Sequence, residues 1–561
     1  MLNIRIEAED MNLSGGYHLE SGSFASGGQF ISLQGGTTTE NGTASIVFTG
    51  ATGLYNIAIN YFDEADGKGQ LRFYKQNSQI KSLLLDQSRG SSLATQQSRT
   101  YEVIGSQIAL KAGDVLKIQG FEDQGEAARV DYIELIPVVP NPLIGTNGND
   151  ILRGDFQNNN ISARAGNDIF KAGKGNDNFN GEAGIDTADY SELSKGIIAN
   201  LSTRIVLKPI FGTNVPKIMP LGDSITAGQF PISPTPGGYR IQLWNNFVSN
   251  GITVDFVGSQ FNGPTQLGDK NHQGHPGYTI DQINDLLNSG ILSTYQPNII
   301  TLMIGTNDIL TGKSITEMYG DLSNLIDRIT SFSPSTQVLV SSITPIDPAT
   351  RGQSAANQVT NFNLMIPDLV RDKAEAGKKV TFVNAGGSLS LDDMVSDGFH
   401  PNATGYQKFG NEWYKALVAR DTLISIENIV GTDYDDVLIN GNSINRLTGG
   451  DGDDIFAYNK SSDGNDTITD FNPTDDVFRI SASGFGGGLQ AGIALKTTAS
   501  STGVLVSNSN PISIGNRANF LYDTDQGVLS FDVDGLGSQA ARRIATLTGL
   551  PSLSVNDFLI S

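Results

Sequence analysis

The chain has 561 residues, which at about 150 residues per domain predicts three or four domains. Its 37 Lys and Arg against 59 Asp and Glu give a formal net charge of −22, which excludes a broad surface for nucleic-acid phosphates or anionic lipid. The absence of Cys excludes disulfides, thiolate zinc sites, iron–sulfur clusters and cysteine nucleophiles. The sequence has no run of 18 apolar residues, so it predicts no transmembrane helix. The start, MLNIRIE, lacks the pattern of a cleavable signal peptide.

Residues 1–137 alternate apolar and polar residues in short runs such as LYNIAINYF and DVLKIQGF, which are separated by turn residues. This period of two predicts a β-sandwich of roughly 130 residues. The start of the segment, around Glu7 and Glu9, and its end, around Asp131, resemble carbohydrate-binding modules of the family six and family thirty-five type. The resemblance implies that Glu7, Glu9 and Asp131 hold a structural calcium ion. A purely structural sandwich with solvated carboxylates is the alternative.

Residues 145–189 divide into five consecutive nonapeptides: GTNGNDILR, GDFQNNNIS, ARAGNDIFK, AGKGNDNFN and GEAGIDTAD. A second array at 431–457 reads GTDYDDVLI, NGNSINRLT and GGDGDDIFA. In both arrays the sixth position is Asp or Asn and the eighth is apolar. Each unit therefore predicts a glycine-rich turn with a carboxylate beside its carbonyls, followed by a short strand whose apolar residue faces the core.

Stacked turns of this kind offer the hard oxygen ligands that calcium prefers. The pattern resembles the RTX calcium β-roll, and it predicts calcium ligands at the sixth positions, namely Asp150, Asp168, Asp177, Asp186, Asp436 and Asp454. Asn159 and Asn445 depart from the Asp rule, so we expect those turns to bind calcium weakly.

The two arrays read as one array that a further domain interrupts. The first array, with its continuation, occupies 145–202, and the second occupies 421–480. We interpret the segment between them, 215–420, as a domain inserted at an exposed turn, where insertions are tolerated.

Three motifs in the insert carry the chemistry. An apolar run ends at Gly222-Asp223-Ser224, which predicts a strand, a tight turn and a helix start with an exposed hydroxyl. A second buried strand ends at GTND (305–308), and DGFHP (397–401) places Asp397 three residues before His400. In this order the motifs resemble the SGNH, or GDSL-type, hydrolases. The phrases GGYRIQLW, DKNHQGHPGYTI and DGFHPNATGY are most similar to carbohydrate esterase family three, the acetylxylan-esterase group.

The resemblance implies an α/β three-layer domain with a flavodoxin-like parallel sheet and a serine-hydrolase mechanism. Ser224 is the expected nucleophile, His400 the general base and acid, and Asp397 the group that orients His400. The expected oxyanion hole consists of the Ser224 N–H, the Gly277 N–H and the Asn307 side-chain amide. A Ser–His dyad without Asp397 is the alternative.

His272 and His275 lie three residues apart on a glycine-rich loop. We interpret them as loop or substrate-contact residues, because the sequence supplies no third ligand for zinc.

Residues 481–561 are rich in Gly and Ser and strand-like, and they resemble the C-terminal part of RTX exoproteins, which carries an uncleaved secretion signal. The resemblance implies type I export from a bacterium and an extracellular location, with the secretion machinery as a partner.

The sequence therefore predicts a multidomain, secreted esterase that removes acetyl or other small acyl groups from polysaccharide. Calcium would be structural, no cofactor would enter catalysis, and the partners would include acetylated polysaccharide but no nucleic acid. The alternatives are a lipid esterase or thioesterase on the same fold, and a matrix or adhesion protein with a vestigial hydrolase.

Overall fold

The computed structural model describes residues 3–22, 24–33, 40–64, 67–86, 93–95, 98–123, 125–138, 142–228 and 236–561. The chain divides into two compact units, and each is described by itself. The first unit comprises Met1–Pro140, Gly277–Leu292 and Leu302–His400. The second comprises Asn141–Pro276, Ser293–Thr301 and Pro401–Ser561.

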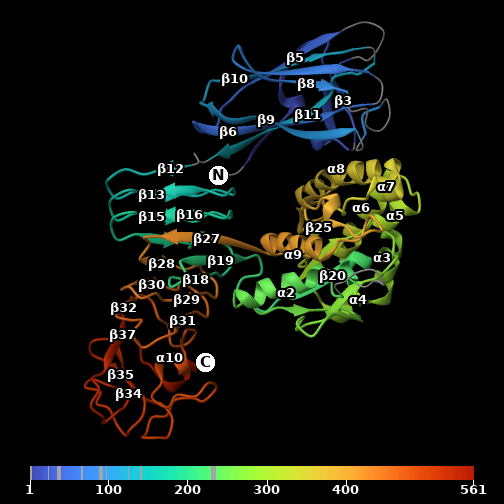
Figure 1. Cartoon of the computed structure of the whole chain (residues 1–561). Coiled ribbons are helices and arrows are strands. Elements are labelled where there is room, and N and C mark those ends of the chain that lie inside the picture. Colours follow the sequence, from blue (N-terminus) through green and yellow to red (C-terminus); the bar gives the residue numbers. More distant parts are fainter. Residues whose placement is uncertain are drawn as a thin grey trace. The chain divides into compact units, whose positions relative to one another are not determined.

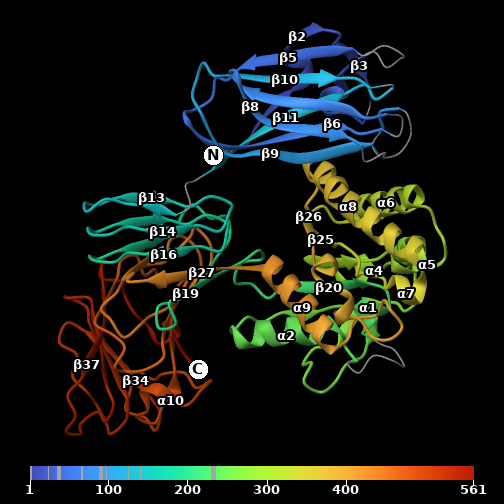
Figure 2. The same cartoon turned by 45° about the horizontal axis from the view of Figure 1, so that its top comes forward.

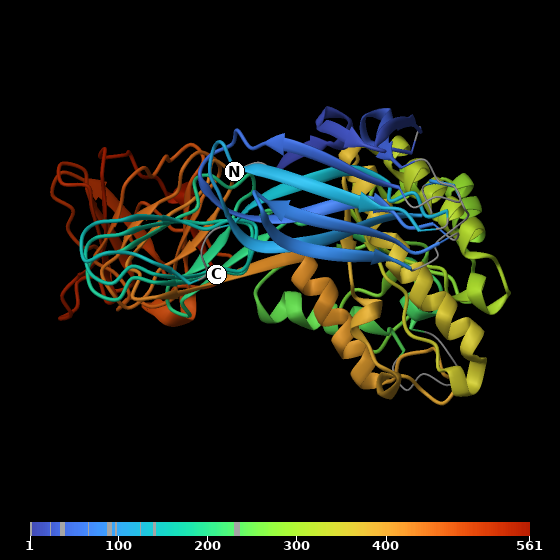
Figure 3. The ribbon, with the colours of Figure 1, turned by 90° about the horizontal axis from the view of Figure 1, so that it is seen from above.

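The N-terminal part of the first unit is a β-sandwich (Figures 2 and 3). One sheet has the order β3 (His18–Ser21), β4 (Gln29–Ser32), β11 (Val130–Val138), β6 (Gly53–Phe62) and β9 (Arg99–Leu110), with β1 (Ile4–Glu7) beside β11. The other has the order β2 (Asn12–Gly15), β5 (Asn41–Val47), β10 (Val115–Phe121), β7 (Gly69–Lys75) and β8 (Ser78–Leu85). Alternate side chains of β10 are buried, and apolar residues of both sheets form one core.

The nonapeptides of the second unit form a roll of short parallel strands, stacked in Figure 1. Ile151 pairs with Ile169 and Asn160 with Asn178, so one coil takes 18 residues and contributes one strand to each of two sheets. All eighth-position residues of the two arrays face the core and are at most 8% exposed: Leu152, Ile161, Phe170, Phe179, Ala188, Leu438, Leu447 and Phe456.

The two arrays share both sheets, each of ten strands. The first sheet has the order β12 (Leu143–Ile144), β14 (Asn160–Ser162), β16 (Asn178–Asn180), β27 (Val418–Ile424), β19 (Ile205–Pro209), β18 (Ile198–Asn200), β29 (Val437–Ile439), β31 (Ile455–Tyr458), β33 (Val477–Ile480) and β38 (Phe558–Ile560). The second has the order β13 (Ile151–Arg153), β15 (Ile169–Lys171), β17 (Thr187–Asp189), β28 (Asn428–Val430), β30 (Arg446–Thr448), β32 (Asp466–Ile468), β37 (Arg542–Leu547), β36 (Val528–Asp532), β35 (Asn519–Asp523) and β34 (Val504–Asn508).

The segment between the two arrays leaves and rejoins the roll through two neighbouring strands. β27 continues the parallel stack after β16, and β19 lies antiparallel to both β27 and β18. Pro209, at the end of β19, pairs with Val418, at the start of β27. The chain therefore leaves the roll and returns to it at adjacent positions.

The segment 481–561 is continuous with the roll rather than separate from it. Its last strand, β38, pairs with β33, and β37 pairs with β32, while α10 (Ala482–Phe485) buries Phe485 in the same core. This C-terminal segment therefore extends both sheets of the roll.

The insert contains an α/β sheet with the order β22 (Gln260–Phe261), β23 (Asn271–Gly274), β20 (Lys217–Gly222), β24 (Ile299–Met303), β25 (Gln337–Ser341) and β26 (Val380–Val383), with β21 (Asp255–Phe256) beside β20. β22 is antiparallel to β23, whereas β20 pairs in parallel with β21 and β23, as β25 does with β26. The run IITLM of β24 is buried throughout, as expected for a strand covered on both faces.

The helices of the insert are α1 (Ser224–Ala227), α2 (Tyr239–Ser249), α3 (Ile280–Leu286), α4 (Ile291–Tyr295), α5 (Thr306–Leu310), α6 (Ile315–Phe332), α7 (Pro348–Arg351), α8 (Gln353–Glu375) and α9 (Ala403–Leu417). In the second unit α2 packs on α9, with Tyr239 against Phe409 at 4.9 Å between ring centroids. In the first unit α6 packs against α3 and α8. None of the helices in the described part of the chain has the length and apolar character needed to span a bilayer.

Candidate functional site

Ser224 is the first residue of α1, directly after β20 and Asp223. The Asp223 carboxylate accepts the N–H of Ile225 at 2.9 Å and caps the helix. Gly228 ends it with a φ of +58°, a conformation that glycine adopts without strain. Ser224 is 8% exposed, so the strand, turn and short helix hold it in a largely buried position, and the prediction of an exposed hydroxyl from the sequence is wrong.

Arg240 of α2 clamps the backbone of this turn. Its buried guanidinium donates to the carbonyls of Thr226 at 3.2 Å and Ala227 at 2.9 Å, and further to those of Asn262 and Lys270. Burial lowers the pKa of Arg240 to about 10, although nearby phenols and Asp269 raise it. Sequence patterns alone do not single out Arg240. An arginine in the phrase GGYRIQLW, within an apolar helix, was the available signal.

The loop after β23 lies against the same turn. The N–H of His275 donates to the carbonyl of Gly222 at 2.8 Å, and a Cβ at Gly274 would lie 2.4 Å from the Ala227 nitrogen. His272 is buried, and its Nδ1 accepts the N–H of Gly274 at 3.0 Å. Burial, assisted by the charges of Arg240 and His275, lowers the pKa of His272 to about 2. His272 therefore acts as a neutral acceptor that shapes this loop.

Asp397 and His400 lie together in the first unit. Asp397 Oδ2 lies 2.6 Å from His400 Nδ1. The other oxygen, Oδ1, accepts the N–H groups of Phe399 and His400 at 3.1 Å each. Burial raises the pKa of Asp397, but these hydrogen bonds outweigh it and hold the pKa below its ordinary value. The carboxylate is therefore ionised and positioned to orient the imidazole.

Gly277 and Asn307, the other expected oxyanion donors, lie on segments that hydrogen bond to each other. The Asn307 amide donates to the carbonyl of Tyr278 at 2.9 Å, and Asp308 accepts the N–H of Ile280 at 3.0 Å. Gly277 has a φ of +82°, where a side chain would be strained. Because an amide carries two N–H donors, one of those of Asn307 is left after the bond to Tyr278.

The sixth-position residues of the roll form ladders. The N–H of Asp150 donates to Asp168 at 2.7 Å, that of Asp168 to Asp186 at 2.8 Å, and that of Asp436 to Asp454 at 2.8 Å. The ladders continue through Asp421, Glu427, Asp466 and Asp476, which the sequence analysis did not single out. Each of these four precedes a buried apolar residue by two positions, and this was the signal that could have found them.

The ladder residues differ in what their second oxygen contacts. The Oδ2 atoms of Asp168, Asp186, Asp421 and Asp454 are buried and accept no hydrogen bond. By contrast, Thr146 donates to Asp150 Oδ2, and Thr432 donates to Asp436 Oδ2. Asp177 Oδ2 lies 3.4 Å from Lys208 Nζ.

Asp168, Asp186 and Asp454, whose open oxygens contact no lysine among the residues described, fit calcium ions. Burial, with the nearby carboxylates, raises the pKa of Asp454 to about 8 and that of Asp186 to about 6, so each site disfavours negative charge without a cation. Within the described residues no three His, Cys, Asp or Glu side chains converge on one point, so backbone carbonyls would have to supply the other ligands. Asp168 and Asp186 on one ladder, and Asp454 on another, would help to hold separate ions, which would neutralise the stacked carboxylates.

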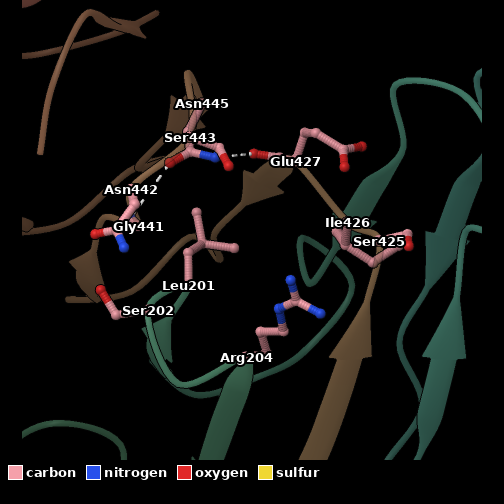
Figure 4. A pocket seen from close by; sticks show the side chains of 10 residues that line it. All are labelled: Leu201, Ser202, Arg204, Ser425, Ile426, Glu427, Gly441, Asn442, Ser443 and Asn445. Atoms are coloured by element: carbon pink, nitrogen blue, oxygen red, sulfur yellow. Dashed lines mark hydrogen bonds between the residues drawn. The ribbon is translucent and has the colours of Figure 1, made fainter.

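The turn that contains Asn445 satisfies its sixth position without a cation (Figure 4). Asn445 Nδ2 donates to the carbonyl of Glu427 at 2.7 Å, and its Oδ1 accepts the N–H of Gly441 at 3.3 Å. A cavity of about 150 Å³ lies beside it, between three turns of the roll. This arrangement is consistent with the expected weak calcium binding at Asn445.

Glu7, Glu9 and Asp131 of the sandwich also lie near one another, because the charges of Glu7 and Glu9 act on Asp131. Both oxygens of Asp131 accept the N–H of Ser26, and one pairs with Arg99 at 3.1 Å. Burial raises the pKa of Asp131 to about 7, although Arg99 lowers it. Glu7 Oε2 and Glu9 Oε2 are buried without a hydrogen bond. The calcium site at this cluster stays a prediction, since Arg99 already compensates Asp131.

Comparison with known proteins identifies two parts of the chain. Residues 221–408 match the GDSL-like Lipase/Acylhydrolase family, and residues 144–179 and 156–188 match the RTX calcium-binding nonapeptide repeat. The chain is 31% identical over 223 residues to the Multidomain esterase of Ruminococcus flavefaciens, covering 36% of this chain and 28% of the relative. It is 36% identical over 143 residues to the Putative endoglucanase X of Acetivibrio thermocellus, covering 25% and 58%.

A solved structure, the Clostridium thermocellum family 3 carbohydrate esterase, is 38% identical, covers 36% of this chain and 94% of its own, and has a TM-score of 0.32. The chain spans less than two thirds of either curated relative. It contains a GDSL/SGNH esterase domain and RTX repeats, which confirms both predictions.

Proposed function

We propose that the chain is a secreted esterase that removes acetyl or other small acyl groups from a polysaccharide and that structural calcium stabilises its roll. The observation that carries the catalytic part is the Asp397–His400 pair at 2.6 Å, in which an ionised carboxylate fixes the imidazole. The similarity to the Multidomain esterase of Ruminococcus flavefaciens supports ester hydrolysis, and the phrases GGYRIQLW and DGFHPNATGY, which resemble acetylxylan esterases, support the choice of substrate. The RTX repeats support type I export to the outside of the cell.

In the proposed reaction, Ser224 Oγ attacks the acyl carbonyl carbon and gives its proton to His400 Nε2. His400 then returns the proton to the sugar oxygen as the ester bond breaks, leaving an acyl-enzyme on Ser224. Water, deprotonated by His400, hydrolyses this ester and releases acetate. The N–H groups of Ser224 and Gly277 and the Asn307 amide stabilise the negative charge on the carbonyl oxygen, and one such donor is typically worth about 3–4 kcal/mol.

We propose that the N-terminal sandwich binds the polysaccharide and so raises the local concentration of substrate at the esterase. Its two-sheet architecture and the buried acidic cluster around Asp131 support a module with its own binding function. The type I secretion machinery would be the other partner.

The test is acetate release from a panel of acetylated polysaccharides, compared with hydrolysis of p-nitrophenyl esters of increasing chain length. Acetate release from the polysaccharides, with a preference for short acyl chains, would support the proposal. A preference for long chains would instead indicate a lipid esterase or thioesterase. If a fluorophosphonate fails to label Ser224, the hydrolase is vestigial and the adhesion alternative holds.

A further inference from the structure

Strand β19 brings a lysine into the interior of the roll. Lys208 lies two residues after Val206, whose side chain is fully buried in the roll core. Side chains two apart on a strand share a face, so Lys208 also points inward, and it is 8% exposed. A buried ammonium group is costly unless oxygen atoms surround it.

Four oxygen atoms surround the Lys208 ammonium. Nζ donates to the carbonyls of Gly173 at 2.9 Å and Gly175 at 2.6 Å. It also lies 3.4 Å from Asp177 Oδ2 and 2.5 Å from Asp421 Oδ1. Asp177 and Asp421 are almost completely buried, so solvent does little to screen these pairs.

These oxygens belong to one turn of the ladder formed by the sixth-position carboxylates. We call each such turn, with its carbonyls and carboxylates, a rung. Gly173, Gly175 and Asp177 are the second, fourth and sixth positions of the nonapeptide AGKGNDNFN. Asp421 is the next carboxylate of that ladder, because it accepts the N–H of Asp177 at 2.9 Å, just as Asp186 accepts that of Asp168. Turn carbonyls and two carboxylates are the kind of oxygen ligands that calcium would bind here. Asp421 Oδ2, like the Oδ2 atoms of Asp168, Asp186 and Asp454, accepts no hydrogen bond, but only at Asp421 does a lysine pair with the other oxygen, Oδ1, in the described part of the chain.

We propose that the Lys208 ammonium is a built-in replacement for calcium, so that this rung binds no calcium ion and stays closed in its absence. The position of this rung indicates what the replacement of calcium by lysine achieves. Lys208 belongs to β19, which leads into the esterase domain, and Asp421 belongs to β27, which leads out of it. The two strands that anchor the esterase are therefore joined to the β16 turn by a cation that chelation does not remove. This inference rests on the proposed calcium binding by the other rungs.

The charges predict what removal of the lysine would do. Without Lys208, the carboxylates of Asp177 and Asp421 would face each other and two turn carbonyls with no cation between them. A Lys208→Ala variant leaves space where the ammonium was, so we expect it to bind one calcium ion more per chain than the wild type. Lys208→Met fills the space without charge, so it should gain no ion.

The experiment measures bound calcium per chain in the full-length protein by equilibrium dialysis and metal analysis, together with thermal unfolding in calcium and in chelator. Lys208→Ala should bind one additional ion and lose more thermal stability in chelator than the wild type, with recovery on adding calcium. Lys171→Ala is the matched control, because Lys171 is on the same roll and pairs with Asp189 at 2.5 Å but lies 20% exposed. It should leave the number of bound ions unchanged.

A second pair of variants tests the wild-type rung and covers the case in which Lys208→Ala does not fold. Asp421→Asn should leave the number of bound ions unchanged, whereas Asp454→Asn should lower it by one. A loss of one ion in Asp421→Asn would overturn the proposal, as would a folded Lys208→Ala variant that gains none. If the wild type and Asp454→Asn both bind no calcium, the proposed calcium function fails, and a gain from zero to one in Lys208→Ala would still support the role of Lys208.

Discussion

Asp397 Oδ2 lies 2.6 Å from His400 Nδ1, and the Asp397 carboxylate is itself held by two backbone N–H groups of the same loop. A histidine oriented in this way can act as the general base for a nucleophile, and Ser224 is the expected nucleophile. We therefore expect Ser224→Ala to lower acetyl-ester hydrolysis by at least about 10³-fold. The measurement is kcat/KM for p-nitrophenyl acetate, with Ser249→Ala, on the exposed end of α2, as the control. Near wild-type turnover in Ser224→Ala would rule out the serine mechanism.

Asp397→Asn should lower kcat by about 10²–10⁴-fold, because the variant cannot hold the tautomer of His400 that accepts a proton. A loss of less than tenfold would favour the Ser–His dyad instead.

Asp397→Asn should also change how thermal stability depends on pH. The folded pKa of Asp397 is below its ordinary value, so the ionised form stabilises the fold, and this contribution is complete above about pH 5. It disappears as the pH falls through the folded pKa. The difference in Tm between the wild type and Asp397→Asn should therefore be constant from pH 5 to 8 and shrink below about pH 4. A difference that persists in acid would show that the effect does not come from ionisation.

Arg240→Met should lower both activity and the free energy of unfolding. The buried guanidinium satisfies carbonyls of the Ser224 turn and of the loop at Asn262, and each buried carbonyl left without a donor typically costs about 1–3 kcal/mol. Urea unfolding measures the loss, with Arg153→Met, at an exposed position, as the control. If Arg240→Met is as stable as the control, the clamp is not needed to hold the turn.

Removal of calcium should unfold the coils around Asp168, Asp186 and Asp454, where buried carboxylates would be left uncompensated. Circular dichroism with and without a chelator should show the loss. Hydrolysis of p-nitrophenyl acetate at moderate temperature should persist, because the proposed mechanism uses no metal. Immediate loss of turnover would point to His272 and His275 as metal ligands.

Gly449→Ala should weaken calcium binding at Asp454. A Cβ at position 449 would lie 2.0 Å from Asp454 Oδ2, so the carboxylate would have to move away from the turn. Calcium titration followed by circular dichroism should show a higher midpoint. Gly320→Ala, on α6 with open space around it, is the control. An equal calcium midpoint in both variants would contradict calcium binding at Asp454.

Much of the architecture could be predicted from local patterns. Alternation in residues 1–137 and the nonapeptide phase specify strands whose buried faces the structure reproduces, as at Ile118 and Phe179. The motifs at Ser224 and Asp397 predict where the esterase chemistry lies, because a tight turn after a buried strand and a DxxH loop are short-range features.

The remaining features depend on contacts between distant segments. Arg240, Lys208 and Asp421 are ordinary residues in the sequence, and their roles follow only from strands and turns that folding brings together. The ladder from Asp177 continues at Asp421, 244 residues later, so counting in nines from the first array could not reach it.

The pairing of β19 with β27 also governs the order in which the molecule can be assembled. Strand β16, which follows Asp177, pairs with β27, and β27 comes after the entire esterase domain in the sequence. The ribosome therefore completes the esterase before this part of the roll can form. Closing a loop of this length in an unfolded chain carries an entropic cost that grows with the logarithm of its length. A folded esterase whose ends meet at Pro209 and Val418 shortens the effective loop to a few residues. Folding of the esterase before the roll would therefore place the two strands that border it close together.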